Sequence, residues 1–289
     1  MKIKTERLSP KTICTSVKIT SRDWSQPILL TSDQHFDSTH CDRAMLKRHL
    51  DEALKIDAPV YIIGDWFDGM QGRSDKRSSK AALRPELKRA DYLNALVEET
   101  CEFLTPYAHI IQGWAEGNHE TSILRYAEFN LISACIRDLH QRTGANIQQM
   151  GYSGWIFVRP EGRRNRHQVA PARITYTHGY GGGVVTRGAL NVNRRAVQWP
   201  DADCVVSGHI HESYVMEVRR ERMSSHGTPY EDTQWHIQTP TYKDEFAGDG
   251  SGWWHETGKS PRPKGGWWVD ISLQAGDANK VQLSPRRAQ

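Results

Sequence analysis

The stretch PVYIIGDWFD, residues 59–68, joins a short apolar run to a glycine and two aspartates. Runs of about four to eight apolar, β-branched residues that end in turn-forming residues are typical of buried strands. The pattern recurs in PILLTSD at 27–33, AHIIQGW at 108–114, RITYTHG at 173–179 and DCVVSGH at 203–209. The sequence therefore predicts a series of buried strands that each stop at polar residues.

Segments with helical spacing lie between these runs, at residues 42–55, 85–104 and 122–143. Strands that alternate with helices predict an α/β fold built in layers. After His211 the pattern changes to strands separated by turns, which predicts an antiparallel edge or a second sheet. These later strands are expected at 213–223, 234–239, 266–273 and 280–284.

The length of 289 residues fits one large domain, and we expect a single core. Residues 1–25 are interpreted as a polar lead-in. Residues 243–266 are interpreted as a loop rich in Gly and Trp, and residues 267–289 as C-terminal strands. Paired Trp residues at 253–254 and 267–268 could stack on bases, although such pairs more often complete a core.

The cysteines and the apolar residues both indicate the cytoplasm. The five cysteines are scattered and odd in number, as expected for reduced thiols. The N-terminal sequence has no apolar signal core, and the chain has no run of 18 apolar residues. We therefore expect a cytoplasmic protein without a membrane span.

The net charge of +4 is distributed unevenly. Residues 73–89 carry seven basic and two acidic side chains, and residues 159–173 carry five and one. With three further arginines, at 187, 194 and 195, these segments reach +12 and the remainder is at −8. Basic patches attract phosphate polymers, so Arg73, Arg77 and Arg187 are candidate substrate contacts. Solvated surface loops are an equally good interpretation.

Side chains of the kind that bind metals follow each of the five apolar runs. Open α/β sheets place their sites beyond the carboxyl ends of strands, and residues two apart on an extended segment point to the same side. The set contains two Asp, one Asn and four His, all oxygen or nitrogen donors that suit Mn²⁺, Fe or Zn²⁺. The candidate ligands are Asp33, His35, Asp65, Asn118, His178, His209 and His211.

The series DQH, GDWFD, GNHE, an isolated His-Gly and GHIH resembles the calcineurin-like metallophosphoesterase family, over about residues 28–212. Within that family it is similar to the repair-exonuclease branch and to phage-encoded members. The resemblance implies a four-layer α/β/β/α sandwich of two mixed sheets, with the metal site at the carboxyl ends of strands. It also implies two divalent ions, Mn²⁺ first, with Fe, Zn²⁺ or Ni²⁺ as alternatives.

The resemblance further implies a role for each ligand. Asp33, His35, Asp65 and His211 would hold one ion, and Asp65, Asn118, His178 and His209 would hold the other, with Asp65 as the bridge. His119 matches the general acid of the family, and Asp68 matches the carboxylate that orients this acid. Glu120 is expected to fix the orientation of the ligands from behind.

One spacing departs from the family pattern. Residues 112–116 separate the third apolar run from GNHE, which members usually connect directly. Either the strand continues through Trp114, or Asn118 lies on a longer loop. The glycines after His178, including Gly181 and Gly182, could let backbone N–H groups approach a phosphate, but a plain turn is the more ordinary interpretation.

The expected reaction is hydrolysis of a phosphodiester, in nucleic acid or a nucleotide. Two cations roughly 3.5 to 4 Å apart can acidify a bridging water and clamp a phosphoryl group for in-line attack. The same site also serves a phosphomonoesterase acting on a protein or a small metabolite. A degenerate fold kept as a non-catalytic binding scaffold is the alternative from another class.

Overall fold

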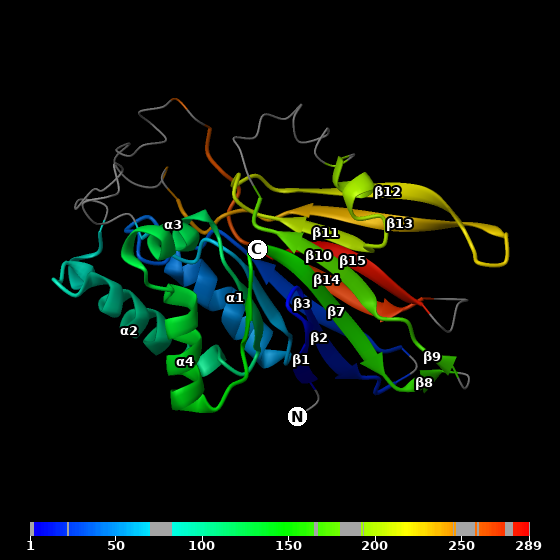
Figure 1. The fold of residues 1–289 in the computed structure, drawn as a ribbon, viewed down its shortest axis with the longest axis horizontal. Coiled ribbons are helices and arrows are strands. Elements are labelled where there is room, and N and C mark those ends of the chain that lie inside the picture. Colours follow the sequence, from blue (N-terminus) through cyan, green and yellow to red (C-terminus); the bar gives the residue numbers. More distant parts are fainter. Residues whose placement is uncertain are drawn as a thin grey trace.

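The computed structural model shows two β-sheets that face each other, with a layer of helices outside one of them (Figure 1). It describes residues 3–21, 23–69, 83–164, 167–179, 192, 194–244, 246, 258, 260–274 and 280–288. No helix in this part of the chain is long and apolar enough to cross a lipid bilayer.

The first sheet has six strands in the order β15-β14-β3-β4-β5-β6. Strands β3 to β6 run parallel, whereas β14 and β15 are added antiparallel at the edge beside β3. Their bounds are β3 (Ser25–Thr31), β4 (Val60–Ile63), β5 (Ile111–Ala115), β6 (Gln148–Met150), β14 (Gly266–Leu273) and β15 (Val281–Ala288). The first three apolar runs of the sequence are thus confirmed as strands.

The second sheet has seven strands in the order β1-β2-β7-β10-β11-β13-β12, and a small hairpin, β8 (Arg163–Arg164) and β9 (His167–Gln168), stands apart. The bounds are β1 (Ile3–Ser9), β2 (Thr12–Lys18), β7 (Ser153–Glu161), β10 (Ala172–Thr177), β11 (Cys204–Ser207), β12 (Tyr214–Met223) and β13 (Pro229–Gln238). The last two apolar runs are β10 and β11. The later strands extend both sheets instead of forming a sheet of their own. β14 and β15 pair antiparallel, whereas β13 joins β11 in parallel and only β12 adds an antiparallel edge to the seven-stranded sheet.

The polar lead-in over residues 1–25 needs correction, because it contains β1 and β2. These strands bury polar side chains that have partners. Thr15 is fully buried, lies 2.8 Å from the hydroxyl of Thr5, and accepts a hydrogen bond of 2.6 Å from the Tyr61 hydroxyl. A buried polar group costs little when it is hydrogen-bonded, so these strands lack the apolar pattern that marks the others.

The helices are α1 (Arg43–Lys55), α2 (Tyr92–Leu104), α3 (Asn118–Ala127) and α4 (Leu131–Thr143), with short 3₁₀ turns η2 (Pro85–Leu87) and η3 (Thr105–Tyr107). The helix predicted at residues 42–55 is confirmed as α1, whose N-cap Asp42 accepts the N–H of Met45. The segment 85–104 is divided into η2 and α2. The segment 122–143 is also two helices, because Glu128 adopts a left-handed conformation that ends α3.

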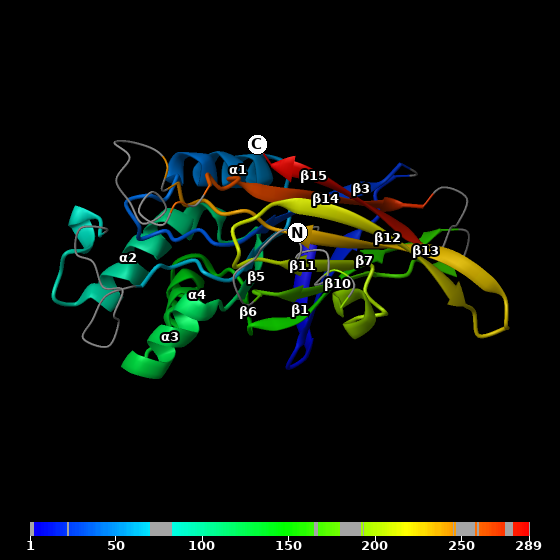
Figure 2. The ribbon, with the colours of Figure 1, turned by 90° about the horizontal axis from the view of Figure 1, so that it is seen from above.

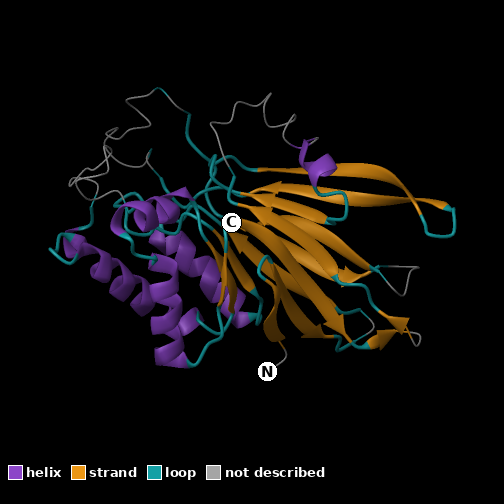
Figure 3. Ribbon diagram, in the orientation of Figure 1, coloured by secondary structure: helices purple, strands orange, loops and turns teal. Residues whose placement is uncertain are grey.

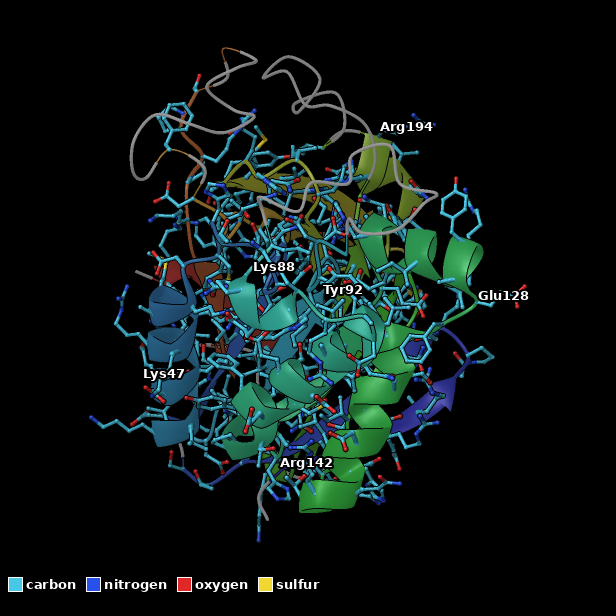
Figure 4. The ribbon with its side chains drawn as sticks, turned by 90° about the vertical axis from the view of Figure 1, so that its left-hand side faces the viewer. Lys47, Lys88, Tyr92, Glu128, Arg142 and Arg194 are labelled. Atoms are coloured by element: carbon cyan, nitrogen blue, oxygen red, sulfur yellow. The ribbon has the colours of Figure 1, made fainter. Side chains whose placement is uncertain are left out.

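Two apolar clusters hold the layers together. One lies between the helices and the six-stranded sheet, and the other fills the space between the two sheets. Figure 4 views the helical layer, with Lys47 of α1 and Arg142 of α4 on its outer surface. Trp267 and Trp268 are buried in the core, so they cannot stack on bases, and Trp253 and Trp254 lie outside the described residues.

The α/β class with two mixed sheets is confirmed. Figure 2 shows the helical layer to one side and the sheets stacked beside it. On the outer face of the seven-stranded sheet, the described residues place one short helical segment, 194–198, where Arg195 donates to the Ser207 hydroxyl at 2.6 Å. All five cysteines are free and buried, and burial raises the pKa of Cys41 to about 12.

Candidate metal centre

The candidate ligands meet where β3, β4, β5, β10 and β11 end. Figure 3 shows the loops after the strands gathered between the helices and the sheets. Asp33, His35, Asp65 and His178 are buried, whereas His209 and His211 are partly exposed. The ligands from both sheets therefore form one site with a closed floor and an accessible side.

Strained backbone conformations set the direction of several of these side chains. The φ angles are 54° at Asp33, 48° at His35, 50° at Asp65, 75° at His209 and 56° at His211, all in the left-handed region that is costly for residues other than glycine. The predicted reason for their convergence, alternation along an extended strand, is therefore wrong. The strands end first, and tight turns then direct the side chains inward.

Backbone hydrogen bonds hold the turns in register. The N–H of Asp33 donates to the carbonyl of Gly64 at 3.0 Å, and the N–H of His35 donates to that of Asp65 at 3.2 Å. The carboxylate of Asp33 accepts the N–H of His209 at 2.9 Å. These bonds link β3 to β4 in one sheet and to β11 in the other.

The first group of ligands is Asp33, His35 and His211, whose ligand atoms all lie within 4.8 Å of one another. His211 Nε2 lies 3.3 Å from Asp33 Oδ1 and 3.1 Å from His35 Nε2. Burial alone would raise the pKa of Asp33, but contact with His211 lowers it below its usual value. The carboxylate is therefore ionised, as a metal ligand must be.

The second group is Asp65, His178 and His209, joined by Asn118. His178 Nε2 lies 3.0 Å from Asp65 Oδ2 and 3.2 Å from Asn118 Oδ1, and His209 Nδ1 lies 2.7 Å from the same amide oxygen. His178 Nδ1 donates to the carbonyl of Ile63 at 2.9 Å. That bond fixes the tautomer and turns Nε2 toward the other ligands.

Asn118 is placed by the helix that follows β5. The strand continues through Trp114 to Ala115, and Asn118 is the first residue of α3. The longer-loop alternative is therefore wrong. The short loop between β5 and α3 brings the amide to His178 and His209 of the other sheet.

Glu120 holds the ligand loops together from behind. Its carboxylate accepts the N–H groups of Asp65 at 3.1 Å, Phe67 at 3.0 Å and Gly117 at 2.7 Å. Asp65 in turn accepts the N–H of His119 at 3.0 Å. Burial, and next the charge of Asp65, raises the pKa of Glu120 to about 7 in the metal-free protein. Glu120 thus orients the backbone of the loops that carry Asp65 and Asn118.

His119 and Asp68 meet, but not as predicted. His119 Nδ1 donates to the backbone carbonyl of Asp68 at 2.5 Å, which leaves Nε2 as the atom that can exchange a proton. The Asp68 carboxylate instead lies 2.8 Å from Nδ1 of His35 and 3.0 Å from the ammonium group of Lys243. Asp68 therefore contacts His119 through its main chain and His35, a candidate ligand, through its side chain.

Sequence reasoning missed two residues of this site. Asp37 is buried and accepts the N–H groups of Asp68 at 2.6 Å and Gly69 at 3.0 Å, and the hydroxyl of Tyr92 at 2.8 Å. The sequence signal that could have identified Asp37 is its position two residues after the DQH motif. Lys243 lies far from every motif, and no sequence pattern marked it.

The candidate substrate contacts Arg73, Arg77, Gly181, Gly182 and Arg187 lie outside the described residues. Several basic side chains of the same segments are described and have intramolecular partners. Arg84 donates to the carbonyls of Ser38 and Cys41, Arg89 pairs with Asp91 and Glu98, and Arg173 pairs with Asp203.

Gly117 has no room for a side chain. A Cβ atom there would lie 2.0 Å from Asp65 Oδ1 and 2.4 Å from the Asp65 nitrogen. We expect Gly117→Ala to displace Asp65 and to lower divalent-metal affinity by more than about tenfold, since misplacing a ligand costs at least as much as removing its support. Titration calorimetry measures this. Gly151→Ala, where a Cβ atom would meet nothing within 4 Å, is the matched control, and equal affinities in the two variants would contradict the prediction.

The donor set fits a divalent cation, because carboxylate oxygens and imidazole nitrogens lie within 4.8 Å of one another in each group, and an amide oxygen joins the second. In the metal-free protein, burial lowers the pKa of His178, but Asp65 outweighs it and raises the value to about 10. Burial lowers the pKa of His35 and of His209, so these two are neutral near pH 7.

Metal binding should therefore displace a proton from His178. At pH 7 its imidazole is protonated, and a ligand must be neutral, so we expect release of about one proton and an affinity that rises with pH toward the pKa of His178. Calorimetric titration in two buffers of different ionisation enthalpy measures the proton count. Binding without proton release at pH 7 would contradict the prediction.

Residues 26–213 match the model of a protein family that is described as calcineurin-like phosphoesterase. Vps29 of Entamoeba histolytica, crystallised with Zn²⁺, aligns with 91% of this chain and 100% of its own at 11% identity and a TM-score of 0.35. A predicted phosphoesterase of Streptococcus pneumoniae aligns with 91% and 99% at 12% identity and a TM-score of 0.34. No curated protein matches significantly.

The structural likenesses are too distant to carry an argument, so the assignment rests on the sequence match. That match spans all seven candidate ligands together with His119, Asp68 and Glu120. The two groups of ligands lie where its motifs meet in space. The chain belongs to the calcineurin-like phosphoesterase family.

Proposed function

We propose that this protein is a dinuclear-metal phosphoesterase that hydrolyses a phosphodiester, in nucleic acid or in a nucleotide, with Mn²⁺ as the preferred metal. The observation that carries the proposal is the presence of two ligand groups on neighbouring loops, Asp33, His35 and His211 in one and Asp65, His178 and His209 in the other. Asn118 completes the second group.

Asp65 is the proposed bridge between the two ions. Its carboxylate falls in the second group, and its backbone carbonyl accepts the N–H of His35, a candidate ligand of the first group, at 3.2 Å. When bound, two such ions supply an activated water and neutralise charge on the phosphoryl group.

His119 is the proposed general acid. Its Nδ1 is committed to the Asp68 carbonyl, so Nε2 carries the transferable proton and lies 3.8 Å from Asp65 Oδ2, beside the ligands. An imidazole can donate a proton to the leaving oxygen near neutral pH. The residue is 9% exposed, which keeps its ring in one orientation while substrate still reaches it from the accessible side of the site.

The substrate class is supported by charge. The basic segment at 73–89 follows the turn that carries Asp65 and Asp68, and it favours a phosphate polymer over a neutral metabolite. The basic segment at 159–173 ends where β10 begins, at the opposite end of this strand from His178, so it gives the substrate class no support. Lys88 of the first segment is exposed at the start of the helical layer, near Tyr92 (Figure 4). Tyr92 donates to Asp37, which orients the turn carrying Asp68.

The test compares substrates and metals in one series. Metal-free protein is supplied with Mn²⁺, Zn²⁺, Ni²⁺ or Fe²⁺ and assayed on bis(p-nitrophenyl) phosphate and p-nitrophenyl phosphate. It is then assayed on single-stranded DNA, duplex DNA, RNA and cyclic nucleotides at several salt concentrations. We expect greater diester than monoester turnover, greatest activity with Mn²⁺, and polynucleotide binding that weakens with salt. A monoester preference without salt dependence would replace the proposal with a phosphomonoesterase, and no hydrolysis with any metal would favour a binding scaffold.

A further inference from the structure

The segment TPTYKD, residues 239–244, follows β13 and lies outside the part of the chain that matches the family. Thr239, Thr241 and Tyr242 are fully buried. The segment runs from the seven-stranded sheet, where Thr239 bonds to the Ser207 carbonyl, to the six-stranded sheet, where it meets the end of β3. It therefore crosses directly behind the ligands.

This segment secures the first ligand. The hydroxyl of Thr241 and the N–H of Tyr242 both donate to the carbonyl of Asp33, at 2.7 and 3.0 Å. The left-handed conformation of Asp33 is costly by itself and persists only when neighbouring structure fixes it. The same segment is anchored to α1, because the N–H of its cap Asp42 donates to the carbonyl of Tyr242 at 2.8 Å.

Lys243 extends from this anchored segment into the site. Its ammonium group lies 3.0 and 3.3 Å from the two carboxylate oxygens of Asp68, and the Lys243 side chain is only 9% exposed. The Asp68 carboxylate, 7% exposed, lies 2.8 Å from Nδ1 of His35, which is 3% exposed. A buried charge is tolerated only when it is paired, so the lysine and the carboxylate require each other.

His35 can serve as a ligand through Nε2 only if its proton stays on Nδ1. The negative charge of the Asp68 carboxylate, 2.8 Å from Nδ1, favours a proton on this atom, and carboxylates commonly lie beside metal-binding histidines in this way. His35, Asp68 and His119 could also form a third group of ligands, but an ammonium group on both oxygens of Asp68 repels a cation there. Lys243 therefore keeps the Asp68 carboxylate beside His35 and away from a metal ion.

We propose that Lys243 is a positioning residue of the metal centre, which holds the Asp68 carboxylate against His35 so that Nε2 of this histidine faces the ion. The inference rests on the dinuclear centre proposed above. It assigns a role to a residue that none of the family motifs contains.

The test is calorimetric titration of metal-free protein with MnCl₂. Lys243→Met removes the charge and keeps the length of the side chain. We expect it to weaken one of the two sites by about 10 to 100-fold, the usual effect of losing a supporting contact behind a ligand, and to leave the other unchanged. Lys47→Met is the matched control. Lys47 lies on the outer surface of α1 and pairs with Asp51, away from the segment 239–244, so both affinities should match wild type.

Kinetics on bis(p-nitrophenyl) phosphate supply a second readout. Because Lys243 acts through His35, excess Mn²⁺ should restore most of kcat in Lys243→Met, with KM for the diester unchanged. A KM that stays raised at saturating Mn²⁺ would overturn the proposal, because it would place Lys243 on the substrate. Wild-type affinity at both sites would also overturn it, as would equal weakening of both sites together with a lower melting temperature.

Should Lys243→Met fail to fold, Lys243→Gln keeps a hydrogen-bond donor for Asp68 without the charge. We expect a smaller weakening, again at one site, and wild-type affinity at both sites would overturn the proposal. Failure here is distinct from failure of the proposed function. If the wild-type protein binds no divalent ion, both proposals are rejected. If the wild-type protein has two metal sites and Lys243→Met changes the affinity of neither, only the role of Lys243 is rejected.

Discussion

Asp65→Asn should abolish metal-dependent hydrolysis of bis(p-nitrophenyl) phosphate. The residue change removes a carboxylate that lies 3.0 Å from His178 Nε2 and whose Oδ1 accepts the N–H of His119. Loss of a contact behind a ligand costs about 10 to 100-fold in affinity or activity, so loss of a ligand shared by two ions should cost more than about 100-fold. Activity and bound metal, measured by elemental analysis of the purified protein, should fall together.

Asp201→Asn is the matched control for this change. Asp201 is an exposed aspartate that pairs with Arg222, so this variant should keep both activity and metal. Normal turnover by Asp65→Asn would contradict the role of Asp65. Loss of activity with full metal content would show that Asp65 acts on the substrate or water instead of holding the ions.

His119→Asn should impair substrates according to their leaving group. A general acid contributes about 10² to 10⁴-fold where the leaving oxygen needs a proton. p-Nitrophenolate leaves readily without one, whereas phenolate and alkoxide do not. We therefore expect kcat for methyl phenyl phosphate to fall by about 10²-fold or more, and kcat for methyl p-nitrophenyl phosphate to fall much less.

The comparison between the two diesters serves as an internal control, because both meet the same metal ligands. His226→Asn, a change at an exposed histidine, should affect neither substrate. An equal fall on both diesters would contradict the role of His119 as an acid. It would instead assign the His119 side chain to the support of Asp65, whose Oδ2 lies 3.8 Å from Nε2 of His119.

Much of the candidate centre was predictable because its residues follow closely after apolar runs. The runs before Asp33, Asp65 and Asn118 are the parallel strands β3, β4 and β5, whose carboxyl ends meet at one edge. The ligand types, two Asp, one Asn and four His, are also a property of the sequence. Position and chemistry together were enough to predict a metal site here.

Other features had no local signal. Strands β1 and β2 bury hydroxyl groups that have partners elsewhere in the chain. Their polar sequence therefore did not indicate buried strands. The break between α3 and α4 depends on the left-handed conformation of Glu128, which propensity does not reveal. Asp68 was assigned to the right neighbourhood, but which of its oxygens meets His119 depends on the turn that Asp37 holds.

The sequence by itself determined which residues are candidate ligands, because the donor types and the order of the strands are properties of the chain. Only the tertiary structure decided how these residues are aimed. The left-handed turns at Asp33 and Asp65, and the pairing of Asp68 with Lys243, depend on hydrogen bonds and charges between segments far apart in the sequence. Such a contact leaves no periodic pattern or motif in the sequence, because it stabilises the protein only after folding has brought the two segments together.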